Sequence, residues 1–353
     1  MNGINNMENT GSETVYLKEN NLKTAIREAI NQSMENDADV IVFGEDVAEY
    51  GGAYKITEGL LNKYGPNRVK NTPISEIAIA GAAVGAAIAG LRPVIEIQFC
   101  DFLTCAMDQV CNQAAKIRMM SGGKMSVPLV IRTPIGSTGR GAQHSQCLEA
   151  WFMHTSGLKV VIPSSAYDAK GLMATSIRDN NPVLFFEHKL LYAMRNAGKN
   201  ELEPIRPALR EEYFLQFGEA DIKREGKDVT IVATAYMVHE SLRAAAALEV
   251  EGISAEIIDP RTLVPLDEKT ILESVEKTGR LVIVSEDNLT CGVASEIAAI
   301  VAQHGFINLK APIMRLSVPD TPIPFAPSNE KHVIPGVVSI MQTVRAVMEV
   351  ASH

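Results

Sequence analysis

The sequence lacks the short motifs that identify common nucleotide and metal sites. Its five cysteines form no CxxC pair, and no His/Cys cluster has the spacing of a zinc site. No GxGxxG, GKS or GKT pattern opens a helix, which argues against a nicotinamide dehydrogenase and against a P-loop enzyme. An odd number of unpaired cysteines is typical of a reduced, intracellular compartment, so we expect a cytoplasmic protein.

The sequence is also short of positive charge and of long apolar runs. Its net charge is −9, whereas phosphate contacts need clustered Lys and Arg, so we expect no nucleic-acid partner. The apolar run at 77–91 is too short to span a membrane and ends at Arg92, so we expect no membrane partner. Residues 1–14 have no basic start and no apolar core, which predicts a disordered tail rather than a secretion signal.

Strand-like and helix-like segments alternate along the 353 residues. Alternation of this kind predicts an α/β fold of two domains with mainly parallel sheets covered by helices. Gly and Pro residues interrupt the rhythm at 192–207, which we interpret as a linker between domains at 15–191 and 208–353. The expected strands are 40–43, 93–98, 128–132, 159–162, 183–187, 229–233, 255–258 and 281–285, and the expected helices include 104–120, 166–178, 238–250, 267–277 and 294–304.

One carboxylate, Glu76, stands at the start of an alanine- and glycine-rich segment that has no other charge until Arg92. Pro73 favours extended backbone before it, and Ser75 can cap the helix that the alanines propagate. Nearly every face of this helix is apolar, which predicts a buried helix. Glu76 is then either a first-turn partner of the helix dipole or a buried group that handles protons.

A glycine-rich loop at 134–146 follows the strand at 128–132 and contains His144. Loops at strand ends of parallel sheets face the ligand crevice, and an imidazole exchanges protons near neutral pH. Polar neighbours of His144 could fix its tautomer, although a hydrogen-bonded surface histidine explains the pattern equally well. At the end of another strand, Gln98 could hydrogen-bond a planar ring and Phe102 could stack on one, or Phe102 could pack in the core.

Six motifs occur along the chain in one order: TPISE, GLRPVIEIQF, AMDQVCNQAAK, RGAQHSQC, GLKVVIPSS and DAKGL. In this order they resemble the β subunit of the thiamine-diphosphate-dependent first component of 2-oxo acid dehydrogenase complexes. The resemblance covers residues 17–350. RMMSGG and IRDNNPV are most similar to pyruvate dehydrogenase, whereas Gln98, ADIKREG and TPIPFAP are similar to acetoin and branched-chain relatives.

The resemblance implies a pyrimidine-binding domain followed by a transketolase C-terminal-like domain. It also implies oxidative decarboxylation of a small 2-oxo acid, pyruvate before acetoin or branched-chain substrates, and acyl transfer to a lipoyl group. The chain would act only with an α subunit, as two α and two β chains docked on a lipoyl-bearing acyltransferase core. Because the sequence has no GDG segment, Mg²⁺ on the diphosphate is expected to be held by the α subunit.

The resemblance assigns site residues one by one. Glu76 matches the glutamate that hydrogen-bonds the aminopyrimidine ring of thiamine diphosphate, and His144 matches the catalytic loop histidine. Ile74, Gln98 and Phe102 are expected to line the pyrimidine pocket.

The resemblance also implies a structural K⁺ near a helix end, where carbonyl groups left without partners can bind an ion. An ordinary Asn/Pro turn is the alternative there. The residues assigned to K⁺ are Leu129, Ser176, Ile177, Asp179 and Asn181.

Two other functions are open at this point. A self-contained transketolase-like enzyme would need its own diphosphate and Mg²⁺ segment, which the sequence lacks. A non-enzymatic partner subunit would stabilise another chain without contributing chemistry.

Overall fold

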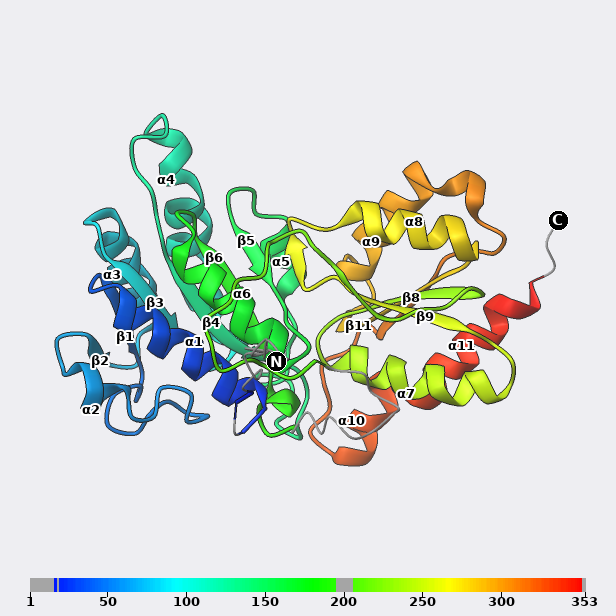
Figure 1. Cartoon of the computed structure of the whole chain (residues 1–353), viewed down its shortest axis with the longest axis horizontal. Helices are drawn as coiled ribbons and strands as arrows, with labels where there is room; N and C mark the ends of the chain where they lie inside the picture. The colour runs from blue at the N-terminus through cyan, green and yellow to red at the C-terminus, as the bar shows by residue number, and fades with distance from the viewer. Residues whose placement is uncertain (1–15, 18, 195–205, 351–353) are drawn as a thin grey trace, which may run out of the picture.

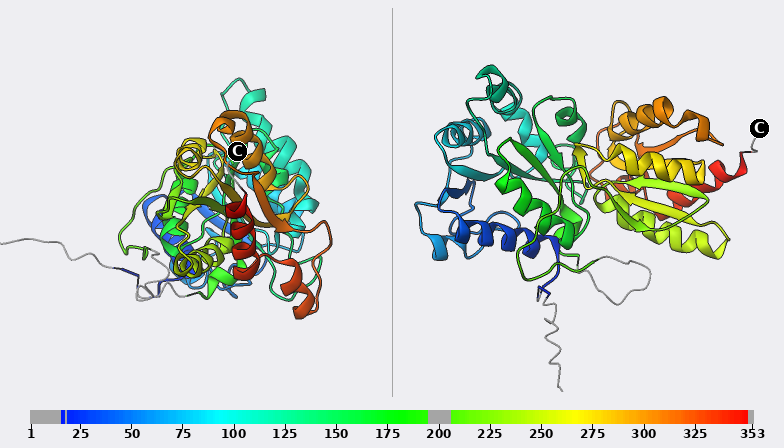
Figure 2. Two further views of the ribbon diagram at one scale, coloured as in Figure 1. Left: turned by 90° about the vertical axis from the view of Figure 1, so that its right-hand side faces the viewer. Right: turned by 45° about the horizontal axis from the view of Figure 1, so that its top comes forward.

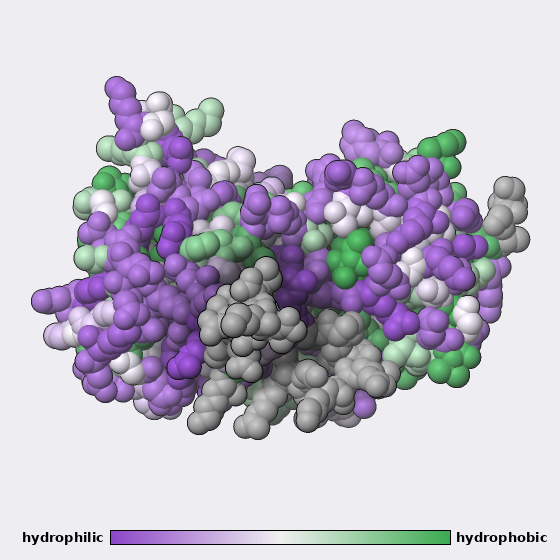
Figure 3. Space-filling view, viewed as in Figure 1, coloured by the Kyte–Doolittle hydropathy of each residue, from purple (hydrophilic) through white to green (hydrophobic). Residues whose placement is uncertain are grey.

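The computed structural model describes residues 16–17, 19–194 and 206–350. The predicted tail at 1–14 and most of the predicted linker at 192–207 therefore lie outside the described residues. Two α/β parts lie side by side (Figure 1), which confirms the predicted fold class. The face shown in Figure 3 is mainly hydrophilic. None of the helices in the described residues has the length and apolar character needed to cross a membrane.

Seven strands within the described residues form the first sheet, in the order β10-β5-β6-β4-β3-β1-β2. Neighbouring strands are parallel except β10 and β5, which are antiparallel. The strands are β1 Val40–Gly44, β2 Val69–Asn71, β3 Arg92–Glu96, β4 Val130–Ile135, β5 Lys159–Val161, β6 Val183–His188 and β10 Thr262–Val264. β10 comes from the second half of the chain, so the two halves share this sheet.

Helices cover both faces of the first sheet because its strands point alternate side chains to opposite sides. Val130 and Phe185 pack with α1 and α6 on one face, whereas Ile131 and Phe186 pack with α3 and the helical stretch after β3 on the other. The helices are α1 Leu22–Asn36, α2 Leu60–Tyr64, α3 Glu76–Ile88, α4 Ala115–Met120, α5 Glu149–Met153 and α6 Ala166–Arg178.

The helix predicted at 104–120 is longer and mixed in type. A 3₁₀ segment, η1 Cys100–Ala106, leads into a π segment, η2 Asp108–Ala114, and then into α4. A second 3₁₀ segment, η3 Lys189–Tyr192, follows β6. η1 begins soon after β3 and so places its side chains at the carboxyl end of that strand.

The second sheet has the order β12-β11-β8-β9-β7, with β7 antiparallel to β9. Helices α7 and α11 cover one face and α8 and α9 the other (Figure 1). α11, the last described helix, runs towards the end of this part that is far from the first sheet (Figure 2). The elements are β7 Asp221–Arg224, β8 Val229–Ala233, α7 Tyr236–Val250, β9 Ala255–Asp259, α8 Glu268–Thr278, β11 Leu281–Asn288, α9 Val293–His304, η4 Phe306–Asn308, β12 Met314–Val318, α10 Pro327–Val333 and α11 Val337–Glu349.

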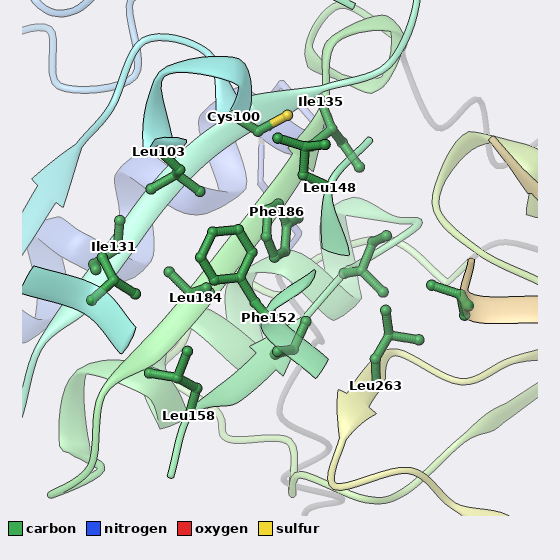
Figure 4. Packing of buried hydrophobic residues seen from close by; sticks show 14 of the residues in the cluster. Cys100, Leu103, Ile131, Ile135, Leu148, Phe152, Leu158, Leu184, Phe186 and Leu263 are labelled. Atoms are coloured by element: carbon green, nitrogen blue, oxygen red, sulfur yellow. The ribbon is translucent and has the colours of Figure 1, made fainter. Parts of the chain in front are cut away.

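One hydrophobic core continues from the first part into the second. Phe152 and Phe186, from α5 and β6, lie with ring centroids 6.0 Å apart, and Leu263 of β10 belongs to the same cluster (Figure 4). The cluster extends to Val232 and Ile283 in the second sheet. Because these side chains are removed from water only when both parts pack, their burial stabilises the junction.

A buried ionic network also joins the two parts. Asp168, in the first turn of α6, lies 2.5 Å from Lys223 on β7 and 2.6 Å from Arg261 after β9. Burial alone would raise the pKa of Asp168, but the two cations hold it at about 2. The network therefore keeps this carboxylate charged inside the protein.

Candidate active site

The polar candidates lie where parallel strands of the first sheet end. Glu45 follows β1, Gln98 follows β3, the loop containing His144 follows β4, and His188 is the last residue of β6. Carboxyl ends of parallel strands meet at one edge of a sheet, where α/β proteins bind ligands. The sheet order β6-β4-β3-β1 makes these four strand ends successive neighbours.

Glu76 is the first residue of α3 and is partly exposed. Among the described residues its carboxylate has neither a hydrogen-bond donor nor an ion-pair partner. Ser75 occupies the N-cap position with extended backbone, but its side chain makes no capping hydrogen bond, contrary to the expectation from sequence. Burial, and next the charge of Glu76, raise the pKa of Glu45. The two carboxylates therefore lie close enough for their charges to interact.

The prediction that α3 is buried on all sides is wrong for this chain. Ile79 and Ala83 face the core, but Ile77 is 52% exposed and Ile88 is 38% exposed. The reason is that α3 packs on β3, η1 and η2, and the described elements leave the rest of its surface open. Ile74 is 82% exposed, so it can line a pocket only when another chain covers it. Its assignment to the pyrimidine pocket stays a prediction.

Two aromatic rings hold the side chain of His144. The ring of Phe99 lies 4.9 Å from the imidazole and that of Phe102 lies 5.6 Å away, both edge to face. The structure thus brings Phe102 to His144, with Gln98 one residue before Phe99. Lys189 Nζ donates a hydrogen bond to the carbonyl oxygen of His144. No described residue hydrogen-bonds either ring nitrogen of His144, so both remain available to a ligand.

The expectation that polar neighbours fix the tautomer of His144 is wrong. Gln146 Nε2 donates instead to Asp101 at 2.8 Å. Ser145 is buried, and its hydroxyl has no hydrogen-bond partner among the described residues. The side chain of Gln143 is exposed. The orientation of the imidazole is therefore set by ring packing, whereas the neighbouring amide of Gln146 fixes the loop.

Sequence reasoning missed several side chains around His144. The ring of Tyr54 packs edge to face on Phe99 at 6.5 Å and lies 4.8 Å from the ring of Tyr192. The guanidinium of Arg140 lies 5.9 Å from the centre of the Phe99 ring, and Lys189 Nζ lies 5.1 Å from it. The sequence offered one signal for these residues, which is their place at strand ends: Lys189 directly follows β6, and Phe99 directly follows Gln98.

A buried ion triad lies in the strands that carry these loops. Arg132 of β4 lies between Glu96 of β3, at 2.9 Å, and Glu187 of β6, at 2.7 Å. The hydroxyl of Tyr192 donates a second hydrogen bond to Glu187. Burial raises the pKa of Glu187, although Arg132 opposes the rise. The triad ties three neighbouring strands together next to the candidate site.

The residues assigned to K⁺ lie around the end of α6, and protein groups contact each of them. Arg92 Nη1 donates to the carbonyl oxygens of Ile177, at 3.0 Å, and Asp179, at 3.2 Å. The carbonyl of Leu129 accepts from Val183 at 2.8 Å. The other contacts are the carbonyl of Ser176 with the amide of Asp179, and the side chain of Asn181 with Arg118.

Each carbonyl oxygen has a second lone pair, so these contacts leave room for an ion. The K⁺ site stays a prediction. Among the described residues, no three or more His, Cys, Asp or Glu side chains form a group that could hold a metal ion.

A cavity of about 360 Å³ lies between the loop that carries His144 and the second part of the chain. Ser145 and Cys147 line it from the first part, and Glu286, Asp320 and Ile323 line it from the second. Neither Glu76 nor Phe102 borders this cavity, so it is separate from the strand-end site.

Comparison with known proteins covers both parts of the chain. Residues 18–195 match the family model of the transketolase pyrimidine-binding domain, and residues 218–340 match that of the transketolase C-terminal domain. Among solved structures, a split-gene transketolase described as an inactive β4 tetramer superimposes with a TM-score of 0.75. It covers 94% of this chain and 99% of its own, at 20% identity, and so supports the fold alone.

Curated relatives match nearly end to end. The β subunit of acetoin:2,6-dichlorophenolindophenol oxidoreductase from Cupriavidus necator is 48% identical over 94% of this chain and 98% of its own. The 2-oxoisovalerate dehydrogenase β subunit of Bacillus subtilis is 46% identical over 87% of this chain and 92% of the relative's length. The β subunit of the pyruvate dehydrogenase E1 component from Rickettsia felis is 47% identical over 92% of this chain and 97% of the relative's length. Identity therefore does not separate the three activities.

Proposed function

Because the chain belongs to the transketolase-related family of β subunits of pyruvate, acetoin and 2-oxoisovalerate dehydrogenases, we propose that it is the β half of a two-chain dehydrogenase. The proposed reaction is the oxidative decarboxylation of pyruvate with thiamine diphosphate, followed by transfer of the acyl group to a lipoyl group. Acetoin and branched-chain 2-oxo acids are the alternative substrates, since relatives of each kind are equally similar.

The observation that carries this proposal is the partnerless carboxylate of Glu76. A carboxylate in a protein normally accepts several hydrogen bonds, but Glu76 accepts none from the described residues. It lies beside the strand ends where Gln98 and Phe102 also lie. A planar ring with a basic nitrogen and an amino group would meet a carboxylate, an amide and an aromatic ring there. These groups fit the aminopyrimidine end of thiamine diphosphate.

Each residue would have one task. The Glu76 carboxylate would hold a proton between its oxygen and the ring nitrogen, Gln98 would hydrogen-bond the ring, and Phe102 would pack on its face. When bound, thiamine diphosphate supplies the electron sink for cleavage next to the keto carbon. His144 would give or take a proton at a ring nitrogen that no described residue occupies. Arg140 and Lys189 would place positive charge beside the anionic substrate.

The rest of the site would come from an α subunit. The sequence has no GDG segment to hold Mg²⁺ on the diphosphate, and the exposed apolar side chains Ile74 and Ile77 need a covering surface. We therefore place Mg²⁺ on the α subunit and expect two α and two β chains. Docking on a lipoyl-bearing acyltransferase core and a K⁺ at the end of α6 are further parts of the proposal.

The test is replacement of Glu76 in the assembled α/β enzyme. Glu76→Gln keeps the size of the side chain but cannot exchange a proton with the ring, so the release of carbon dioxide from pyruvate should fall by at least about 100-fold. Glu268→Gln is a matched control, because Glu268 is also the first residue of a helix but is exposed and remote from the strand ends. Acetoin and branched-chain 2-oxo acids are assayed in parallel to identify the substrate.

Full turnover by Glu76→Gln would refute the assigned role. Turnover by the α chain alone would instead favour the non-enzymatic reading, in which this chain only stabilises its partner. Assembly is checked by the mass of the complex, so a variant that fails to assemble is not counted as inactive.

A further inference from the structure

The loop at 136–145, here called the histidine loop, is held by carboxylates of the second part. The amide of Ser137 donates to Glu286 Oε1 at 2.6 Å, and the amide of Gly139 donates to Glu330 Oε2 at 2.8 Å. Glu286 lies on β11 and Glu330 on α10, both remote in sequence from the loop. Two backbone groups of the loop therefore depend on the second part for their hydrogen bonds.

The second oxygen of Glu286 is bound at the same time. His188 Nε2 lies 2.7 Å from Glu286 Oε2, and the amide of Leu190 donates to His188 Nδ1 at 3.2 Å. Because Nδ1 accepts, the proton is on Nε2, which donates to Glu286. Glu286 and His188 are both buried, and the ring of Tyr236 stacks on His188 at 5.3 Å. The carboxylate is thus fixed from both sides.

The beginning of the loop also lies directly against this pair. Gly136 has a φ of +88°, and a Cβ built there would lie 2.0 Å from His188 Nε2. The backbone at Gly136 therefore has no space to move towards His188, the residue that holds Glu286. At the other end of the loop, Lys189 holds the carbonyl oxygen of His144. Both ends of the histidine loop are fixed, and among the described residues of β11 it is Glu286 that hydrogen-bonds the loop.

We propose that Glu286 is a positioning residue, which sets the place of His144 by holding the amide of Ser137 against His188. The proposal rests on the proposed function, because only there is His144 given a role in the reaction. The second part of the chain would then act in catalysis without touching the substrate. This assigns a task to a residue of the transketolase C-terminal-like region.

The first test measures the loop itself, in the full chain and without any activity. In Glu286→Ala the amides of residues 137–144 should exchange hydrogen about tenfold faster than in the wild type, as followed by mass spectrometry of the peptide. Glu286→Gln keeps an acceptor for the Ser137 amide and should show an intermediate rate. Glu251→Gln, which removes a surface carboxylate of the second part, should leave the rate unchanged.

The second test is a double-mutant cycle in the assembled α/β enzyme. Glu286→Ala should lower kcat for acylation of a free lipoyl domain by about 10- to 100-fold, with KM for pyruvate within about twofold. Glu286→Gln should recover part of the loss. In a His144→Ala background, Glu286→Ala should have no further effect on kcat, because the residue it positions is absent.

The outcomes separate the two proposals. If His144→Ala transfers acyl groups at the wild-type rate, the role of His144 fails. If His144→Ala is slow but Glu286→Ala is normal, or lowers kcat equally in both backgrounds, the positioning role alone is overturned. Unchanged hydrogen exchange at 137–144 in Glu286→Ala also overturns it.

Discussion

Replacing Glu149 with Gln should remove a large part of the pH dependence of stability. Glu149 is the first residue of α5, is buried at the junction of the two parts, and has an oxygen without a hydrogen-bond partner among the described residues. Burial, followed by the charges of Asp287 and Glu286, raises its pKa from 4.5 to about 8. At neutral pH the folded protein therefore keeps a proton that the unfolded chain releases.

The sign and the size follow from proton linkage. The folded pKa lies above the unfolded one, so the contribution is complete below pH 4.5 and is lost as the pH rises towards 8. Each pH unit in this window changes the free energy of unfolding by about 1.4 kcal/mol. At pH 8 about half of the Glu149 side chains in the folded protein are ionised. Between pH 6 and pH 8 the free energy of unfolding of the wild type should therefore fall by about 2 kcal/mol because of Glu149 alone.

The assay is urea unfolding of the wild type and Glu149→Gln at pH 6, 7 and 8. Asp287, whose pKa is also raised by burial, is present in both proteins, so the difference between their slopes isolates Glu149. Glu268→Gln, at an exposed helix start, should keep the wild-type slope. Equal slopes for the wild type and Glu149→Gln would refute the reasoning, because Glu149 would then be ionised in the folded protein.

Two further predictions concern the strands and the histidine loop. Arg132→Met leaves two buried carboxylates without their cation and should lower the free energy of unfolding by about 3–5 kcal/mol. The control Arg345→Met, which removes an exposed ion pair, should barely move the urea midpoint. Similar midpoints for the two variants would contradict this prediction. Gly136→Ala combines a positive φ with a clash against His188. It should therefore lower the free energy of unfolding by more than Gly139→Ala, where the new Cβ meets no atom within 4 Å and only the backbone strain of about 1–2 kcal/mol applies. Equal losses in urea unfolding would show that the clash is relieved.

Local periodicity predicted the central elements of both sheets well. The helix expected at 166–178 is α6, and the strands expected at 229–233 and 281–285 are β8 and the first part of β11. These segments are long enough, and apolar enough, for their own pattern to determine their structure. The helix α11 was missed although Ile340, Val344 and Val347, which it buries, recur at helical spacing.

Short edge strands were missed for a different reason. β10 has three residues, and its partner β5 lies about a hundred positions earlier in the chain. A pattern of three residues carries no periodicity, and antiparallel pairing across the two halves depends on how they pack. β7, at the edge of the second sheet, has only four residues and pairs antiparallel with β9 through an irregular register. As a result, the sequence does not reveal that the two halves share a sheet.

The candidate site was predicted where a motif contains the residue, and missed where two distant loops meet. Glu76 and His144 stand in motifs that can be read directly. Tyr54 and Arg140 reach the ring of Phe99 from loops that the sheet brings together. Glu286 lies 149 positions from Ser137, and no local pattern connects them. Contacts of this kind depend on the fold, so the sequence alone could not supply them.

The exposure of α3 has a consequence for the chemistry of Glu76. Water around a partly exposed carboxylate competes for its hydrogen bonds and so weakens the bond that it can make to a ligand. The side chains Ile74 and Ile77 beside it are apolar and exposed, so a second chain that covers them would also exclude water from Glu76. Removal of water strengthens a hydrogen bond between this carboxyl group and a ring nitrogen of a ligand. If Glu76 has the role proposed above, assembly with a second chain completes its surroundings, and we expect the isolated chain to bind thiamine diphosphate weakly.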